Sequence, residues 1–271
     1  MDRTQEELYL KKCGFSHRNK YEQYVKERIG DLEFIAPQLF KIFKDAVREW
    51  ETYYLRGKRK RFVAETLSPQ GDKLLKGPDR VVEKIFESWE RYTEWEGLSK
   101  GKRAKKPPTT HDPKNFLHTM TDLIRFRIVC NYLCDVRHIE ERIEINIQSI
   151  EDRIRCFDRK CRKLTSKKVD HISIPFPERR AGHRSVQYVF EYSGEGGPTL
   201  FEVQVMTQLQ HAWDKKDHHL IYEYVRVKQG HKIPLHLKNR MAAMSELLYV
   251  ADTVFDELRE DIAAIMEKDT T

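Results

Sequence analysis

The stretch that decides the fold is RSVQYVFEYSGEGGPTLFEVQVM, residues 184–206. It contains two runs in which apolar and polar side chains alternate, which is the pattern of a β-strand with one buried face. The glycine-rich SGEGGP between the runs is typical of the connection in a β-hairpin. The stretch therefore predicts two neighbouring antiparallel strands at the centre of a sheet.

Side-chain parity predicts which residues share a face of this hairpin. If the connection closes symmetrically, Gln187 lies opposite Gln204. The polar face would then carry His183, Ser185, Gln187, Glu202 and Gln204. This face is a candidate site, but antiparallel sheets also turn one face to water, and a one-residue slip in register would separate these side chains.

Helical and strand-like segments alternate along the rest of the chain. Helical periodicity is found in four segments: 21–55, 79–92, 135–150 and 208–225. A T-x-x-Q capping box at 207–210 opens the last of them. Period-two alternation predicts three more strands: 62–67, 125–132 and 153–157. Pro37 is the expected break in the first helical segment, and residues 159–183 are expected to form a long basic loop.

These segments predict an α/β (α+β) fold class, with a mixed β-sheet of about five strands flanked by helices. The C-terminal residues add a heptad pattern, because apolar side chains recur in steps of four and three from Leu237 to Ile265. The pattern predicts a coiled-coil seam or a helix–helix dimer contact, and hence a homo-oligomer; a helix packed on its own domain explains it equally well.

The charge balance favours an anionic partner. The chain has 50 Lys+Arg against 43 Asp+Glu, a formal net charge of +7. The surplus is concentrated in RGKRKRF (56–62), SKGKRAKK (99–106) and RKCRKLTSKK (159–168). Such runs suit nucleotides, nucleic acid or acidic membrane surfaces, although each is also compatible with a solvated surface.

Cysteine spacing and hydropathy narrow the class of protein. Five cysteines without a C-x-x-C pair argue against a disulfide framework and a zinc site. Asp214 and His218 stand four residues apart on a predicted helix, which indicates a structural hydrogen bond more than a metal pair. The charged N-terminus and the lack of an apolar run of about 18 residues predict a cytoplasmic protein without membrane contact.

A carboxylate beside arginines precedes one of the predicted strands. Asp122 is followed by Arg125 and Arg127, which share one face of that strand. This pattern fits a salt bridge, and it equally fits a magnesium ligand beside phosphate-binding guanidinium groups.

A second group of charges lies at the start of a predicted helix, in KLLKGPDRVVEK (73–84). Lys76 lies in a turn, and Arg80 and Lys84 follow it four and eight residues later. Cations at a helix start can hold phosphates, with help from the helix dipole.

Taken in chain order, these segments resemble the synthetase domain of the RelA/SpoT homologue family, the alarmone synthetases, over residues 62–225. The family's R-x-K motif is followed by a second lysine eight residues after the first. Lys76 and Lys84 match the two lysines, whereas Leu74 stands in place of the arginine.

Further motifs of the family follow in the same order. The family's D-x-x-G-x-R resembles DLIRFR (122–127), with Arg125 in place of the glycine. Its D-Y-I-x-x-P-K and G-Y-R-S-L-H resemble DHISIPF (170–176) and GHRSVQ (182–187). Its E-I-Q-I-R-T resembles EVQVMT (202–207).

The resemblance implies a nucleotidyltransferase-like synthetase domain at residues 62–228, an N-terminal helical extension (1–61) and a C-terminal heptad-patterned helix (229–271). It also implies an ATP-dependent pyrophosphokinase with Mg²⁺ as cofactor. In that reaction the β,γ-pyrophosphate of ATP moves to the ribose 3′-hydroxyl of a purine nucleotide, most simply GDP or GTP. The products are a (p)ppGpp-type alarmone and AMP.

The resemblance assigns roles to residues of this chain. The residues that would act in catalysis and coordinate Mg²⁺ are Asp122 and Glu202, and Glu202 would also accept the proton of the attacking hydroxyl. Those that would bind ATP are Lys76, Arg80, Lys84 and, by stacking on adenine, Arg127. Those that would contact the acceptor are His183, Arg184, Gln187 and Gln204. Such a site works through positioning and charge neutralisation, because little covalent chemistry is needed.

Two alternatives stay open at this point. Some family members are toxins that pyrophosphorylate the 3′ end of tRNA; the basic runs would then bind tRNA, and an antitoxin protein would be a partner. The departures at Leu74, Arg125 and Met206 are also compatible with a degenerate nucleotide- or RNA-binding module without activity.

Overall fold

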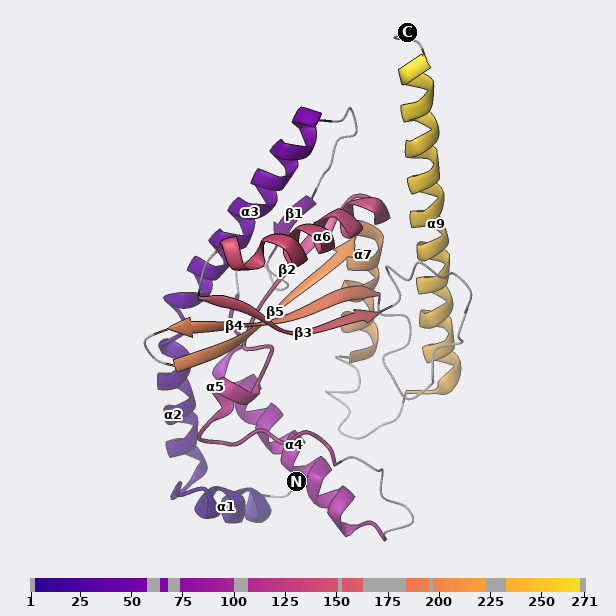
Figure 1. The fold of residues 1–271 in the computed structure, drawn as a ribbon. Helices are drawn as coiled ribbons and strands as arrows, with labels where there is room; N and C mark the ends of the chain where they lie inside the picture. Colours follow the sequence, from indigo (N-terminus) through magenta and orange to yellow (C-terminus); the bar gives the residue numbers. More distant parts are fainter. Residues whose placement is uncertain are drawn as a thin grey trace.

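The centre of the protein is a mixed β-sheet. The computed structural model describes residues 3–57, 64–67, 74–99, 107–150, 153–162, 184–194, 197–222 and 233–268. Within these residues, five strands form the sheet, in the order β1-β2-β5-β4-β3 (Figure 1). Their bounds are β1 Ala64–Leu67, β2 Ile124–Cys130, β3 Ile154–Arg162, β4 Ser185–Gly194 and β5 Gly197–Thr207. Strands β2 and β5 pair in parallel, and the other neighbouring strands are antiparallel.

Helices flank this sheet. Their bounds are α1 Arg3–Lys12, α2 Arg18–Gly30, α3 Ile35–Gly57, α4 Pro78–Gly97, α5 Phe116–Thr119, α6 Leu133–Ile150, α7 Gln208–Asp217, the π-helix η1 His218–Tyr222 and α9 Leu235–Lys268. In Figure 1, α1, α2 and α4 lie together below the sheet, whereas α9 stands beside α7 and reaches past the sheet at its C-terminal end. The predicted α+β class, a mixed sheet with flanking helices, is confirmed.

The β4–β5 hairpin has the register that its sequence predicts. Gln187 lies opposite Gln204, so both side chains share a face with that of Glu202. The ladder closes at Gly197, whose φ of 95° lies in the left-handed region that residues with a Cβ rarely adopt. The predicted polar face is therefore present for these strand residues, whereas His183 lies outside the described residues.

Aromatic packing fills the opposite face of the sheet. The ring of Phe43 in α3 lies 5.1 Å from that of Phe126 in β2 and 5.3 Å and 5.9 Å from those of Phe190 and Phe201. All four side chains are fully buried. Since burying one such side chain contributes about 1.5–3 kcal/mol, this cluster holds α3 to one face and leaves the polar residues of β2 and β5 on the other.

Two expected boundaries are wrong. Residues 31–34 separate α2 from α3, and Pro37 lies in the first turn of α3, where the missing N–H breaks no helical hydrogen bond. Residues 159–162, expected in a loop, belong to β3 and pair with β4. An irregular register just before Asp158 interrupts the alternation there and hides the extension of the strand. The rest of the expected loop, 163–183, lies outside the described residues.

Helix α9 contacts the domain with apolar residues, among them Ala242 and Tyr249, and with polar ones. Ser245 and Asp252 are buried, and Asp252 accepts a hydrogen bond from Oγ1 of Thr207 at 2.6 Å. Heptad residues in the C-terminal half of the helix point elsewhere, since Phe255 and Ile262 are 52% and 57% exposed. Packing of the heptad stripe on its own domain therefore does not explain these residues. Across the described helices, none combines the length and the apolar character needed to cross a membrane.

Candidate active site

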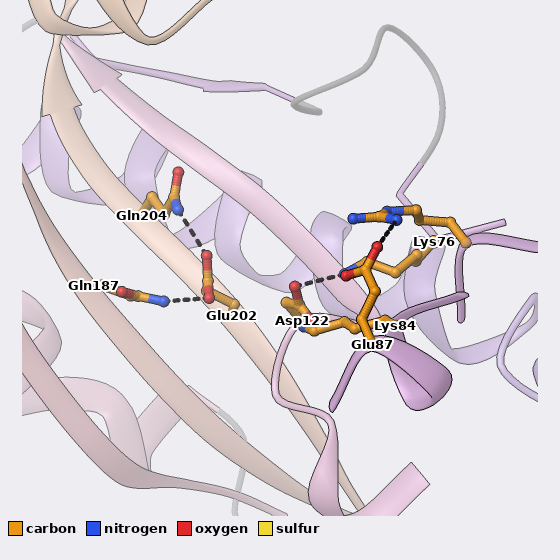
Figure 2. Close-up of polar contacts among 8 residues, drawn as sticks. Lys76, Lys84, Glu87, Asp122, Gln187, Glu202 and Gln204 are labelled. Atoms are coloured by element: carbon orange, nitrogen blue, oxygen red, sulfur yellow. Dashed lines mark hydrogen bonds and ion pairs between the residues drawn. The ribbon is translucent and has the colours of Figure 1, made fainter. Parts of the chain in front are cut away.

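The turn before β2 holds a carboxylate between two lysines. Asp122 accepts a hydrogen bond from Nζ of Lys76 at 2.6 Å on one oxygen and from Nζ of Lys84 at 2.5 Å on the other (Figure 2). Lys84 lies in α4, and Lys76 precedes that helix. The segment that leads into α4 also pairs with the start of β2, through a bridge between Leu75 and Ile124. This pairing brings both cations to a carboxylate that is distant in sequence.

The lysine–aspartate cluster, formed by Lys76, Lys84 and Asp122, favours the charged carboxylate. Burial opposes the ionisation of Asp122, but the two ammonium groups outweigh it and hold the pKa of Asp122 well below its usual range. Burial also lowers the pKa of Lys76 to about 8; the nearby charge of Asp122 opposes this shift, and those of Lys84 and Arg125 add to it. Asp122 is therefore an anion at neutral pH, whereas the pKa of Lys76, about 8, lies close to neutral pH.

The second carboxylate lies on β5 between two glutamines. Glu202 is 5% exposed and accepts hydrogen bonds from Nε2 of Gln187 and, at 2.7 Å, from Nε2 of Gln204. Burial and the negative charge of Asp122 raise the pKa of Glu202, and the two amides oppose that shift only in part. Figure 2 shows Glu202 beside the lysine–aspartate cluster. The site thus contains two neighbouring carboxylates whose pKa values move in opposite directions.

Arg127 extends this network to α7. Its Nε donates to Oε1 of Gln204 at 3.0 Å, and its guanidinium group forms an ion pair with Asp214. Arg127 is 7% exposed, so in this arrangement the guanidinium face expected to stack on adenine is covered. Sequence reasoning did not assign Asp214 to the site. Its spacing from His218 indicated a structural hydrogen bond, and its place two turns into the helix that Thr207 caps directly after β5 was a further signal.

Two other predicted site residues form ion pairs of their own. Arg80 pairs along α4 with Glu83 at 2.8 Å and with Glu87 at 2.9 Å. Arg184 is buried and pairs with Glu246 of α9. The predicted site residues that the structure brings together are Lys76, Lys84, Asp122, Arg127, Gln187, Glu202 and Gln204. The guanidinium groups of Arg80 and Arg184 serve other contacts.

The donor set has the chemistry of a magnesium site that needs a substrate to complete it. Among the described side chains, no group of three or more His, Cys, Asp or Glu residues could hold a metal ion. Asp122 and Glu202 supply only oxygen ligands, and Mg²⁺ is commonly held by one or two carboxylates together with phosphate oxygens and water. The residues present therefore fit Mg²⁺ bound jointly by the protein and a phosphorylated ligand.

A family comparison agrees with the family that the sequence resembles. Residues 91–227, just over half of the chain, match the sequence model described as a region found in RelA / SpoT proteins. No curated protein matches the sequence.

Solved structures of similar fold include small alarmone synthetases. Small alarmone synthetase 1 from Bacillus subtilis, bound to its product pppGpp, is 17% identical, with a TM-score of 0.50 over 84% of this chain and 94% of that one. Small alarmone synthetase 2 from Bacillus subtilis is 15% identical, with a TM-score of 0.51 over 87% and 98%. A GTP pyrophosphokinase family protein from Streptococcus pneumoniae is 17% identical, with a TM-score of 0.50 over 86% and 94%. At these identities the likeness establishes the fold.

Proposed function

The chain belongs to the RelA/SpoT family of pyrophosphotransferases, and we propose that it transfers the β,γ-pyrophosphate of ATP to the ribose 3′-hydroxyl of GDP or GTP. The observation that carries this proposal is the pair of neighbouring carboxylates, one among cations and the other among neutral amides. Both environments suit transfer of a pyrophosphoryl group, because the donor is a polyanion and the acceptor hydroxyl must lose a proton.

The lysine–aspartate cluster suits the donor. Lys76 and Lys84 lie 2.6 Å and 2.5 Å from Asp122 and would turn to the triphosphate when ATP binds. Asp122, released from the lysines, would then join Glu202 in holding Mg²⁺, which would neutralise charge on the phosphate oxygens. The cost of separating the buried ion pairs is offset because phosphate replaces carboxylate as the anionic partner of each lysine.

Glu202 suits the acceptor. Its raised pKa makes the carboxylate a better base than an exposed glutamate, and the amides of Gln187 and Gln204 hold it in place. In the reaction, the 3′-oxygen forms a bond to the β-phosphorus and the bond from that phosphorus to the α–β bridging oxygen breaks. AMP leaves with the bridging oxygen, and the hydroxyl proton passes to Glu202.

An assay that supplies several candidate acceptors in parallel identifies the molecule that receives the pyrophosphate. The protein is incubated with ATP labelled in the β-phosphate and with GDP, GTP, ADP or deacylated tRNA, and the products are separated. We expect label on GDP or GTP with release of an equal amount of AMP. Label on tRNA alone would overturn the nucleotide acceptor in favour of the tRNA alternative, and no AMP release with any acceptor would favour a binding module.

We further propose that the exposed stripe of α9 associates with α9 of a second copy. Buried residues between positions 242 and 252 attach the helix to its own domain, whereas heptad residues such as Leu258, Ile262 and Ile265 stay 49–59% exposed. A strict repeat of this kind matches a copy of itself better than an unrelated surface. Sedimentation at micromolar concentration should show a dimer or higher oligomer, and the double variant Leu258→Glu/Ile262→Glu should sediment as a monomer; a monomeric wild-type protein contradicts the proposal.

A further inference from the structure

Arg125 occupies a central place between the two carboxylates. It is the second residue of β2, it is half-buried, and its Cα lies opposite that of Glu202 in β5. On its other side, its backbone N–H donates to the carbonyl oxygen of Leu74 at 3.1 Å, in the segment that continues to Lys76. Arg125 therefore stands between the strand that carries Glu202 and the segment that carries a lysine of the lysine–aspartate cluster.

Arg125 differs from the other cations considered for the site in its lack of an acidic partner among the described residues. Each of those has an acidic partner: Lys76 and Lys84 bind Asp122, Arg80 binds Glu83 and Glu87, Arg127 binds Asp214, and Arg184 binds Glu246. The guanidinium group of Arg125 forms no ion pair or hydrogen bond with the residues that the structure describes.

The register also relates Arg125 to the departure at Leu74. The bridge between Leu75 and Ile124 is antiparallel, so Leu74 and Arg125 are direct cross-strand neighbours. Cross-strand neighbours project their side chains to the same face, with Cβ atoms roughly 5 Å apart. An arginine at position 74 and an arginine at position 125 would therefore place a guanidinium group in the same region. Relative to the family motifs, the chain therefore lacks the arginine at position 74 and carries an arginine at the facing position 125.

We infer that Arg125 binds the phosphate chain of the donor nucleotide, between the carboxylates of Asp122 and Glu202. This inference rests on the proposed function. The attacked β-phosphorus has to lie between the base that receives the proton and the lysines that hold the phosphates, and β2 runs between them. A guanidinium group there can form two parallel hydrogen bonds to phosphate oxygens, which an ammonium group cannot.

Binding is measured without turnover. Calorimetry gives the affinity for a non-hydrolysable ATP analogue, for AMP and for GDP, each with Mg²⁺, in the wild-type protein and in the variants Arg125→Gln and Arg125→Lys. We expect Arg125→Gln to weaken binding of the analogue about tenfold while AMP binding changes less than about twofold, and Arg125→Lys to fall between. Arg155→Gln is the matched control, since it removes the same charge from an exposed arginine on β3.

Returning the guanidinium group to the facing position is the sharper test. In the double variant Leu74→Arg/Arg125→Gln, we expect most of the lost affinity for the ATP analogue to return, because the new side chain reaches the same region from the neighbouring strand. Thermal melting and circular dichroism confirm that each variant is folded.

The outcomes separate this inference from the proposed function. Unchanged binding of the analogue by folded Arg125→Gln overturns the inference, and so does a loss confined to GDP, which would assign Arg125 to the acceptor. If Arg125→Gln weakens binding of the analogue but the wild-type protein transfers pyrophosphate to none of the acceptors, the inference stands and the proposed function fails.

Discussion

Asp122 and Glu202 are two carboxylates in one site, and their surroundings differ in kind. Asp122 lies in a turn and is held by two ammonium groups, whereas Glu202 lies within a strand and is held by two neutral amides. Both are largely removed from water, which by itself would raise both pKa values. Only Asp122 has cations close enough to reverse that effect.

The difference separates two tasks. A carboxylate that stays charged under all physiological conditions serves as a permanent anion for a metal ion or for cations. A carboxylate whose pKa is raised serves as a proton acceptor, because it holds a transferred proton more firmly. Substitutions of each carboxylate and of its neighbours test whether Asp122 and Glu202 divide the two tasks in this way.

The largest effect is expected from Glu202→Gln. We expect AMP release in the presence of ATP and acceptor to fall about a thousandfold, since both the base and a metal ligand are lost. Thermal stability should be unchanged or slightly raised, because a buried carboxylate with a raised pKa is replaced by a neutral amide. Glu141→Gln, a change on the exposed face of α6, is the control, and retained activity in Glu202→Gln contradicts the assignment.

Asp122→Asn should affect stability as well as activity. We expect activity to fall about a hundredfold and the free energy of unfolding to fall by about 3 kcal/mol, because two ammonium groups lose their buried partner. Urea denaturation and AMP release measure the two effects. If Asp122→Asn leaves stability intact, as Glu202→Gln is expected to do, the contrast between the carboxylates is lost.

The pH dependence of kcat/KM tests the raised pKa. The rate should rise with pH through a midpoint above 4.5, the ordinary pKa of a glutamate, since the base must be deprotonated. The amide of Gln187 lowers the pKa of Glu202, so Gln187→Leu should move that midpoint to higher pH. A shift to lower pH, or none, would show that another group limits the rate.

Two cations one turn apart on α4 provide a smaller, matched comparison. Lys84 binds Asp122, whereas Arg80 binds Glu83 and Glu87. We expect Lys84→Met to raise KM for ATP about tenfold and Arg80→Met to raise it clearly less, because only Lys84 points into the lysine–aspartate cluster. Equal effects on KM would restore the role in ATP binding that sequence reasoning gave to Arg80.

The smallest effect concerns stability in mild acid. His111 is buried, its Nδ1 has no hydrogen-bond partner among the described residues, and burial lowers its pKa to about 4, with Lys84 adding to the shift. The unfolded chain then binds more protons between about pH 6.5 and 4, so the free energy of unfolding falls as pH falls through that window.

Urea denaturation at several pH values measures this loss. His111→Asn should reduce the slope of stability against pH without removing it, because burial also lowers the pKa of His211 to about 4. The same slope in His111→Asn and in the wild-type protein would contradict the prediction.

Local patterns predicted more of the fold than of the contacts in the site. The hairpin face could be derived from parity, because the two-residue period of a strand and the closing turn are both local. The extension of β3 could not, because a break in register before Asp158 disturbs that period. The contact of Arg184 with α9 also could not, because its partner lies more than 60 residues away in the sequence.

The sequence by itself determined the polar hairpin face, Lys76 before α4 and Lys84 within it, Asp122 before β2, and the family motifs that these residues carry. The tertiary structure alone decided which cations have partners, how the two carboxylates titrate, and that Arg125 faces Leu74. The physical reason is the distance along the chain over which each property arises. Strand and helix periods arise from the nearest residues in the chain, whereas a pKa or an ion pair depends on burial and on charges that the folded chain brings together.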